Sequence, residues 1–307
     1  MTLRATFLGT GGAVPTTERN TSALLVNRDG DRLLFDAGEG TQRQMMRYNT
    51  GFAVSDVFVS HLHGDHVLGL PGLIQTWGFN DRTAPLSVHV PPGTADDVWN
   101  LLRAADTDPA FPVDVREVAP GEVARKADEY EVRAVRAAHT ASAVGYALVE
   151  DERKGRFDRE RAEELGVPPG PKFSTLHGGE PVELEDGTVV DPDEVVGPPR
   201  AGRRVVYTGD TRPTDAVVEA AEGGDLLVHD ATFADDALER ARETGHATAR
   251  EAGEVAAEAG VARLALTHLS SRYTGEAGRL RREAAEAFDG EVLVPDDGQD
   301  LDVPLPG

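Results

Sequence analysis

The most informative stretch of this sequence runs from Val57 to His66 and reads Val-Phe-Val-Ser-His-Leu-His-Gly-Asp-His. Its apolar start is typical of a buried strand, and Gly64 allows a tight turn just after it. Three imidazoles and one carboxylate therefore follow the end of a strand. Because the chain has no cysteine, this donor set favours a borderline cation such as zinc. The spacing predicts a metal-binding loop.

Three more potential ligands also stand at the ends of apolar runs. His139 follows residues 132–138, Asp210 follows residues 205–208, and His268 follows residues 264–267. In layered α/β folds, sites gather beyond the carboxyl ends of the strands, so we expect these side chains to converge on the first loop. Together they offer five histidines and two aspartates, enough for two metal ions that share one carboxylate. Such a pair suits the cleavage of phosphoesters.

Short apolar runs alternate with helical patterns in both halves of the chain, which predicts a layered α/β fold. We expect strands over 4–8, 22–26, 32–35, 56–60, 86–90, 130–138, 144–150, 204–208, 225–229, 263–267 and 291–294. We expect helices over 66–79, 95–105, 215–222, 248–259 and 278–288. Thr248 and Glu251 form a capping-box pattern, and Gly260 is a good helix stop.

The segment 151–202 is rich in proline and glycine, and only 158–165 has a helical pattern. A long segment of this kind is usually functional or a linker. It carries a local excess of positive charge, which on charge alone fits either a solvated loop or an arm that contacts phosphate. The basic residues are Arg153, Lys154, Arg156, Arg159 and Arg161.

The chain of 307 residues has 54 acidic and 31 basic residues, for a net charge of −23, and only three of the basic residues are lysines. Such a charge normally opposes binding to nucleic acid. Either the substrate is not a polyanion, or the protein works in concentrated salt, where the Debye length falls to about 3 Å at 1 M. The composition favours salt adaptation. The sequence shows no secretory signal and no membrane-spanning run, so we expect a cytoplasmic protein.

The His-Leu-His-Gly-Asp-His block at 61–66, with His139, Asp210 and His268, resembles the metallo-β-lactamase superfamily. This resemblance implies an αββα sandwich, with two mixed sheets, helices on the outer faces and two Zn²⁺ per subunit. It assigns one zinc to His61, His63 and His139. It assigns the other to Asp65, His66 and His268, with Asp210 between the two ions.

Further blocks narrow the resemblance to the ribonuclease Z family, short form. They span 35–44, 60–73, 208–213, 229–233, 246–248 and 268–273. The resemblance implies an endoribonuclease that removes 3′ trailers from precursor tRNA, cleaving after the discriminator base and leaving a 3′-hydroxyl. It also implies a homodimer, and a catalytic domain over 1–150 and 203–307 interrupted by an arm over 151–202 that grips the tRNA.

The same resemblance assigns roles to single residues. Asp65 would bind metal, orient the nucleophile and accept its proton, and His246 would protonate the leaving 3′ oxygen. Contacts with RNA are expected from the arm, with its Gly-Pro element, and from one arginine near the C-terminus. These residues are Arg153, Lys154, Arg156, Arg159, Gly170, Pro171 and Arg272. One departure is Thr17, which stands where the family loop matching residues 15–20 has a lysine.

The sequence also indicates roles for polar residues outside the predicted ligand set. Asp36 and Asp230 follow apolar strands and are candidates for supporting the ligating histidines. Asp36 equally fits a solvated residue at a strand end or an acceptor in a turn. His229 fits either a supporting or a packed position, His89 is expected to be structural, and His177 lies in the arm.

Two alternatives stay open at this point. A thioesterase or a general phosphodiesterase of the same superfamily would share the metal pattern. An iron-binding redox relative would typically replace histidine by glutamate, which this chain does not do.

Overall fold

The computed structural model describes residues 1–104 and 108–306, and these form two compact units. The first unit comprises Met1–Val149 and Arg203–Pro304. The second comprises Glu150–Gly202 together with the C-terminal residues from Leu305 onward. No helix among the described residues is long and apolar enough to cross a membrane.

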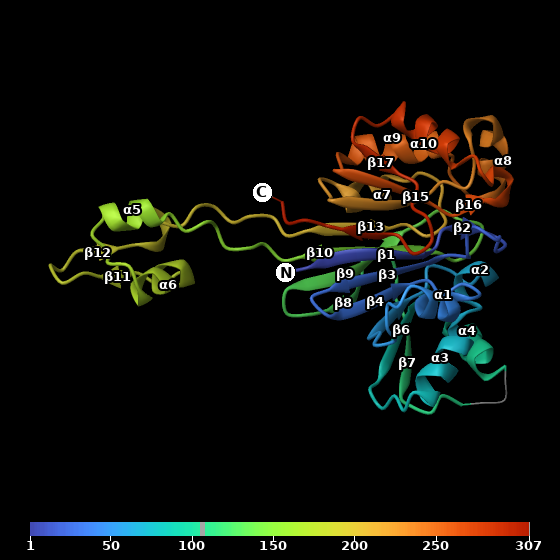
Figure 1. Ribbon diagram of the computed structural model, residues 1–307, viewed down its shortest axis with the longest axis horizontal. Helices are drawn as coiled ribbons and strands as arrows, with labels where there is room; N and C mark the ends of the chain where they lie inside the picture. The colour runs from blue at the N-terminus through green and yellow to red at the C-terminus, as the bar shows by residue number, and fades with distance from the viewer. Residues whose placement is uncertain (105–107, 307) are drawn as a thin grey trace. The chain divides into compact units, whose positions relative to one another are not determined.

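Two seven-stranded sheets form the centre of the first unit (Figure 1). In order, the first sheet contains β18 (Asp300–Asp302), β1 (Leu3–Gly9), β3 (Ala23–Arg28), β4 (Asp31–Phe35), β5 (Asp56–Phe58), β6 (Leu86–Val90) and β7 (Val113–Glu117). The second contains β17 (Glu291–Leu293), β15 (Arg263–Thr267), β14 (Leu226–Asp230), β13 (Arg204–Tyr207), β10 (Val144–Glu150), β9 (Tyr130–Arg136) and β8 (Val123–Lys126). Both sheets mix parallel and antiparallel pairs, as predicted.

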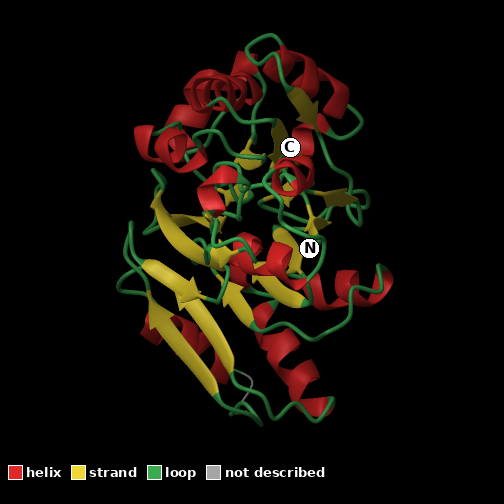
Figure 2. Ribbon diagram, turned by 90° about the vertical axis from the view of Figure 1, so that its left-hand side faces the viewer, coloured by secondary structure: helices red, strands yellow, loops and turns green. Residues whose placement is uncertain are grey.

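Helices cover the outer face of each sheet, and Figure 2 distinguishes them from the strands by colour. The first sheet is covered by α1 (Thr41–Arg47), α3 (Leu70–Phe79) and α4 (Ala95–Arg103), and the second by α7 (Asp215–Ala221), α9 (Ala249–Ala259) and α10 (Ala277–Ala285). Two further α-helices in the described part of this unit are α2 (Gly64–Val67) and α8 (Leu238–Thr244). The predicted αββα fold is confirmed.

Three apolar layers explain why the strands read as continuous apolar runs. One layer lies between the sheets and includes Phe35, Phe58, Tyr146 and Tyr207. The other two lie between each sheet and its helices. Because the central strands are buried on both faces, neither face needs polar side chains, and the alternating pattern of a half-buried strand is absent.

The prediction of one helix over 66–79 is wrong, because the chain forms α2 and α3 with a break at Leu68–Gly69. The break brings Gly69 against the loop before α1, where its N–H donates to Ala37 O at 2.8 Å. A Cβ at Gly69 would lie 2.1 Å from Gly38 O. Pro71 then stands in the first turn of α3, where a missing N–H costs nothing.

Sequence patterns also missed some elements of the first unit. The strands β7, β8 and β18 lie at or next to sheet edges and carry many exposed or charged residues, so their apolar pattern is weak. The short helix α8 was missed as well. The helix predicted over 95–105 ends at Arg103, and its last predicted residue lies outside the described residues.

The second unit has a small core of its own, formed by Ala162, Val167, Leu176, Val182, Val190 and Val195. It contains α5 (Arg159–Glu164), α6 (Pro171–Gly178) and the hairpin of β11 (Val182–Glu183) and β12 (Val189–Val190). The helix predicted over 158–165 is present as α5, and Asp158 is its N-cap. The expectation of a single helix in this segment is wrong, because Pro171 opens α6 rather than interrupting it, with Gly179 as its left-handed C-cap.

Candidate metal centre

The histidine-rich loop follows β5 and leads directly into α2. His61 is buried, His63 is the residue before the helix, and Asp65 and His66 lie in its first turn. The loop is tied to the β4 end, because Ser60 N–H donates to Asp36 Oδ1 at 2.6 Å. The strand and the short helix therefore fix four donor side chains on a rigid frame.

The ligands predicted from distant parts of the chain converge on this loop. His139 follows β9, Asp210 follows β13 and His268 follows β15, so all three come from the ends of strands of the second sheet. Three overlapping groups of donor atoms result, and within each group all the atoms lie within 4.8 Å of one another. The first contains His61, His63, His139 and Asp210, and the second contains Asp65, His66 and His268. The third contains Asp210, Asp230, His246 and His268, and so overlaps both.

Asp210 lies between the first two groups. Its Oδ1 is 3.3 Å from His66 Nε2, and its Oδ2 is 3.3 Å from His268 Nε2 and 3.6 Å from His61 Nε2. Such donor–donor separations suit ligands that each bind a cation at about 2.0–2.2 Å. The structure thus brings together all seven side chains that the sequence singled out as metal ligands.

Four of the imidazoles have the Nδ1 atom close to a polar partner, which leaves the Nε2 atom for a cation. The partners are Ser60 Oγ at 3.1 Å for His61, Asp36 Oδ2 at 2.6 Å for His66, Gly245 O at 2.8 Å for His139, and Thr232 Oγ1 at 2.7 Å for His268. Among the described residues, three buried atoms of the cluster lack any hydrogen-bond partner: His61 Nε2, His66 Nε2 and Asp210 Oδ1. Buried nitrogen and oxygen atoms without a hydrogen-bond partner are suited to bind a metal ion through their lone pairs.

The electrostatics of the cluster are those of carboxylates surrounded by imidazoles. Burial lowers the pKa of His66, but Asp210 and Asp36 raise it well above its usual value. In turn, and against the effect of burial, His268 and His66 hold the pKa of Asp210 well below its usual value. Without a metal, a proton on His66 therefore supplies positive charge beside Asp210, and a cation that binds there must displace it.

Asp36 connects the two sheets beneath the cluster. This fully buried carboxylate accepts hydrogen bonds from Ser60 N–H, Ser60 Oγ and Tyr207 Oη in addition to its contact with His66. Burial and the neighbouring Asp36 charge raise the pKa of Tyr207, so that its hydroxyl stays a donor. Asp36 thus fixes the orientation of His66, the supporting role considered for it from the sequence.

His246 lies beside the cluster, two residues before the helix cap Thr248. Its Nδ1 is 2.9 Å from Asp230 Oδ2 and 3.8 Å from Asp210 Oδ2. Burial lowers the pKa of His246, but the Asp230 carboxylate outweighs this effect and raises it to about 9. In the metal-free protein the imidazole of His246 therefore favours its protonated form at neutral pH.

Sequence patterns did not reveal what holds His246 in place. Arg212 donates to His246 O at 2.6 Å and also binds Glu251 with two nitrogen atoms. Glu251 belongs to the capping box of α9. The sequence predicts the capping box that contains Glu251. Arg212, which binds Glu251, lies 39 residues away, and no local sequence pattern indicates this contact.

The remaining histidines lie outside the cluster. His89 stacks on Phe58 and its Nε2 is 2.9 Å from Asp56 Oδ1, so its role is structural. His229 is buried with Nδ1 2.7 Å from Asp230 O. His177 contacts Gly155 O within the second unit.

The predicted RNA-contacting residues differ in whether their side chains already make hydrogen bonds within the protein. Arg153 donates to Ala201 O and Pro306 O, Lys154 to Gly178 O, and Arg159 to Glu163. Gly170 is the N-cap of α6 and Pro171 its first residue. The exposed guanidinium groups of Arg156 and Arg272 make no hydrogen bond or ion pair among the described residues.

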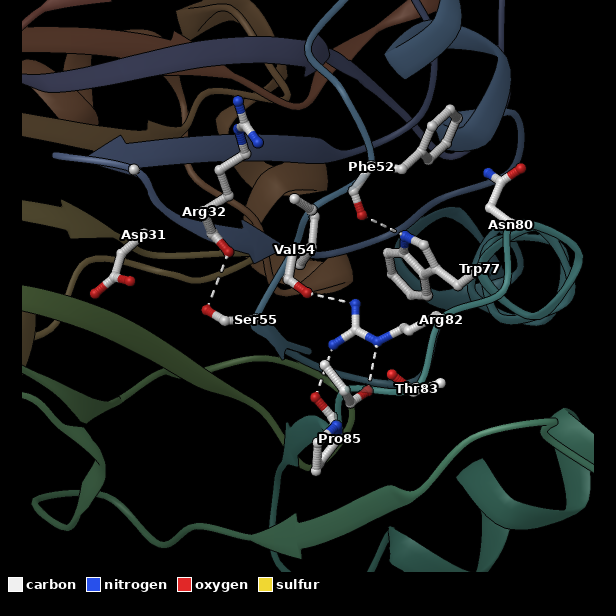
Figure 3. Close-up of a pocket in the computed structure, with 13 residues that line it drawn as sticks. Asp31, Arg32, Phe52, Val54, Ser55, Trp77, Asn80, Arg82, Thr83 and Pro85 are labelled. Carbon is white, nitrogen blue, oxygen red and sulfur yellow. Dashed lines mark hydrogen bonds between the residues drawn. The ribbon is translucent and has the colours of Figure 1, made fainter.

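A separate crevice of about 550 Å³ opens near the starts of β4, β5 and β6, at the end of these strands away from the histidine loop (Figure 3). Arg82 spans it, but its guanidinium is already bonded to Val54 O, Ala84 O and Pro85 O. None of the seven predicted metal ligands is among the described residues that line this crevice.

The fold and the histidine–aspartate cluster define a metallo-β-lactamase-type hydrolase. Residues 193–269 match the beta-lactamase superfamily domain, and residues 3–154 match the family described as anti-Pycsar protein Apyc1. Human tRNase Z, short form, has a similar structure, with a TM-score of 0.71 and 26% identity over 98% of this chain and 100% of that one.

Ribonuclease Z of Halorubrum lacusprofundi is 66% identical over 100% of this chain and 99% of its own length. Ribonuclease Z of Myxococcus xanthus is 50% identical over 99% and 98%. The chain therefore belongs to the ribonuclease Z family and is an endoribonuclease of that type.

The Asp36 network generates a prediction about metal binding. In Asp36→Asn, the amide nitrogen cannot accept the hydrogen bonds that a carboxylate oxygen receives from its donor neighbours. We expect His66 to lose its fixed orientation and the affinity for zinc to fall about 10- to 100-fold. Calorimetric titration of zinc into the metal-free protein measures this change in affinity.

Asp56→Asn is the matched control, because Asp56 forms a similar buried pair with His89 away from the cluster. It should lower stability and leave zinc affinity unchanged. Equal loss of zinc affinity in both variants would show that Asp36 has no specific role.

Proposed function

We propose that the protein removes the 3′ trailer from precursor tRNA, cleaving after the discriminator base, with two Zn²⁺ per subunit. The convergence of two donor groups on the shared Asp210, with His246 alongside, carries this proposal. One ion would be held by His61, His63 and His139 and the other by Asp65, His66 and His268, with Asp210 within reach of both. The relatives and the tRNase Z likeness support the substrate class.

When bound, the ions would supply an activated water and neutralise charge that develops on the phosphoryl oxygens. Asp65 stands in the second donor group and is suited to orient the nucleophile and accept its proton. As the bond between phosphorus and the 3′ oxygen breaks, His246 would give its proton to that oxygen. The tRNA would leave with a 3′-hydroxyl, and the trailer would keep the phosphate.

We further propose that residues 1–150 and 203–307 form the catalytic domain and residues 151–202 the arm that grips tRNA. The separate core of the second unit supports an arm that is a folded module rather than a loose linker. We also propose that the protein is a cytoplasmic homodimer adapted to high salt. The net charge of −23 supports the salt adaptation.

The decisive experiment incubates the protein with a precursor tRNA that bears a 3′ trailer. We expect one cut after the discriminator base, loss of cleavage on treatment with a chelator, and recovery on addition of zinc. Parallel reactions contain a small phosphodiester and a thioester. Faster turnover of either small substrate, with intact precursor, would contradict the proposed substrate.

His246 generates a second prediction. His246→Ala should lower turnover about 100- to 10,000-fold, because the leaving oxygen loses its proton donor. Zinc content should not change, since His246 is not needed as a ligand. Loss of zinc in this variant would contradict the assignment.

The pH dependence tests the same role through Asp230. A general acid works below its pKa, and Asp230 raises the pKa of His246 to about 9. Removing that negative charge in Asp230→Asn lowers the pKa, so turnover should begin to fall at lower pH than in the unmodified protein. An unchanged alkaline limb in the pH–rate profile would argue against His246 as the acid.

Arg156 provides a prediction for the arm, because its guanidinium is exposed and unpaired among the described residues. In Arg156→Ser we expect KM for precursor tRNA to rise about tenfold, through loss of one charged hydrogen bond to phosphate. Cleavage of a small phosphodiester should not change. Lys172→Ser is the control, since Lys172 donates to Glu183 O within the same unit. An equal effect of both substitutions would count against a specific contact at Arg156.

A further inference from the structure

A strained turn lies beside the metal centre. Val14 N–H donates to Gly12 O at 2.8 Å, which closes a three-residue turn around Ala13. Ala13 has a φ of 63°, in the left-handed region that residues with side chains seldom adopt. A γ-turn with positive central φ is rare, and strain of this kind clusters at functional sites.

In this turn, one backbone N–H points at a carboxylate of the active site. Ala13 N–H donates to Asp65 Oδ2 at 2.7 Å, and the same oxygen lies 3.1 Å from His268 Nε2. Asp65 Oδ1 makes no hydrogen bond within the described part of the chain. The turn therefore determines which of the two oxygens is held by the protein and which stays free.

The surroundings hold the turn in this conformation. Gly12 packs so closely on His268 that a Cβ there would lie 2.6 Å from the Cε1 atom of the imidazole. Gly11 and Gly12 form β2, which pairs with β16 (Leu269–Ser270) directly after His268. On the other side, Gly11 N–H donates to Asn20 O at 2.9 Å, at the end of the loop 15–20.

The loop 15–20 is itself anchored. Arg19 donates to Thr10 Oγ1 and to Pro295 O, both at 2.6 Å. The turn thus connects this anchored loop to the carboxylate of Asp65, along the backbone as far as Ala13 and then through one hydrogen bond.

We propose that Ala13 is a positioning residue, whose left-handed backbone holds Asp65 in the rotation that metal binding and proton transfer require. The inference rests on the proposed function for the reaction, but the hydrogen bond and its effect on zinc affinity do not depend on the substrate. The contribution is made by the backbone, because the side chain of Ala13 is exposed.

A backbone role predicts an unusual order among substitutions. Glycine and asparagine tolerate positive φ, whereas a β-branched residue does not. We therefore expect Ala13→Gly and Ala13→Asn to keep kcat and zinc affinity within about twofold of the unmodified protein. Ala13→Val should lower kcat on precursor tRNA about 100-fold with little change in KM, because Asp65 is misplaced. Zinc affinity of Ala13→Val, measured by titration of the metal-free protein, should fall about tenfold.

Asp81→Val is the matched control. Asp81 is exposed, has a φ of 55° and follows α3, so the same residue type is strained at a turn that contacts no ligand. This variant should lose stability but keep kcat and zinc affinity. The proposal is overturned if Ala13→Val keeps both values, or if the glycine and asparagine variants lose as much as the valine variant. If the unmodified protein fails to cleave precursor tRNA, the proposed function fails, and the zinc titrations still decide the role of Ala13.

Discussion

The buried carboxylate of Asp210 is the constraint on which the rest of the site depends. It is 2% exposed and lies within 4.0 Å of imidazole nitrogens from His61, His66, His139 and His268. A buried charge is costly unless opposite charge surrounds it. The fold meets this demand by ending three strands of one sheet and one strand of the other at the same place. Two metal ions on either side of Asp210 would satisfy the same demand and make the cluster reactive.

The parts of the site that a sequence reveals are those encoded locally. The loop 61–66 carries its ligands within one turn of chain, and His139, Asp210 and His268 each follow an apolar run, so strand ends alone predict their convergence. The supporting contacts could not be predicted in this way. Gly245 O and Thr232 Oγ1 orient imidazoles from 106 and 36 residues away, and neither residue differs locally from an ordinary loop residue.

In the fold too, features encoded locally were predicted and those that depend on distant contacts were not. Central strands and the capped helix α9 were predicted because burial on both faces and the Thr248–Glu251 box leave clear patterns. The break between α2 and α3 depends on how closely Gly69 approaches Gly38, a contact between loops that helical periodicity does not encode. In the second unit, proline at the start of a helix resembled a helix breaker, so α6 was missed.

The central claim is that seven side chains hold two metal ions on either side of Asp210. Crystals grown with zinc, with diffraction recorded on both sides of the zinc absorption edge, test it most directly. The account predicts two anomalous peaks per chain, one among His61, His63 and His139 and one among Asp65, His66 and His268, with Asp210 in contact with both. A single peak, or peaks away from Asp210, would contradict it.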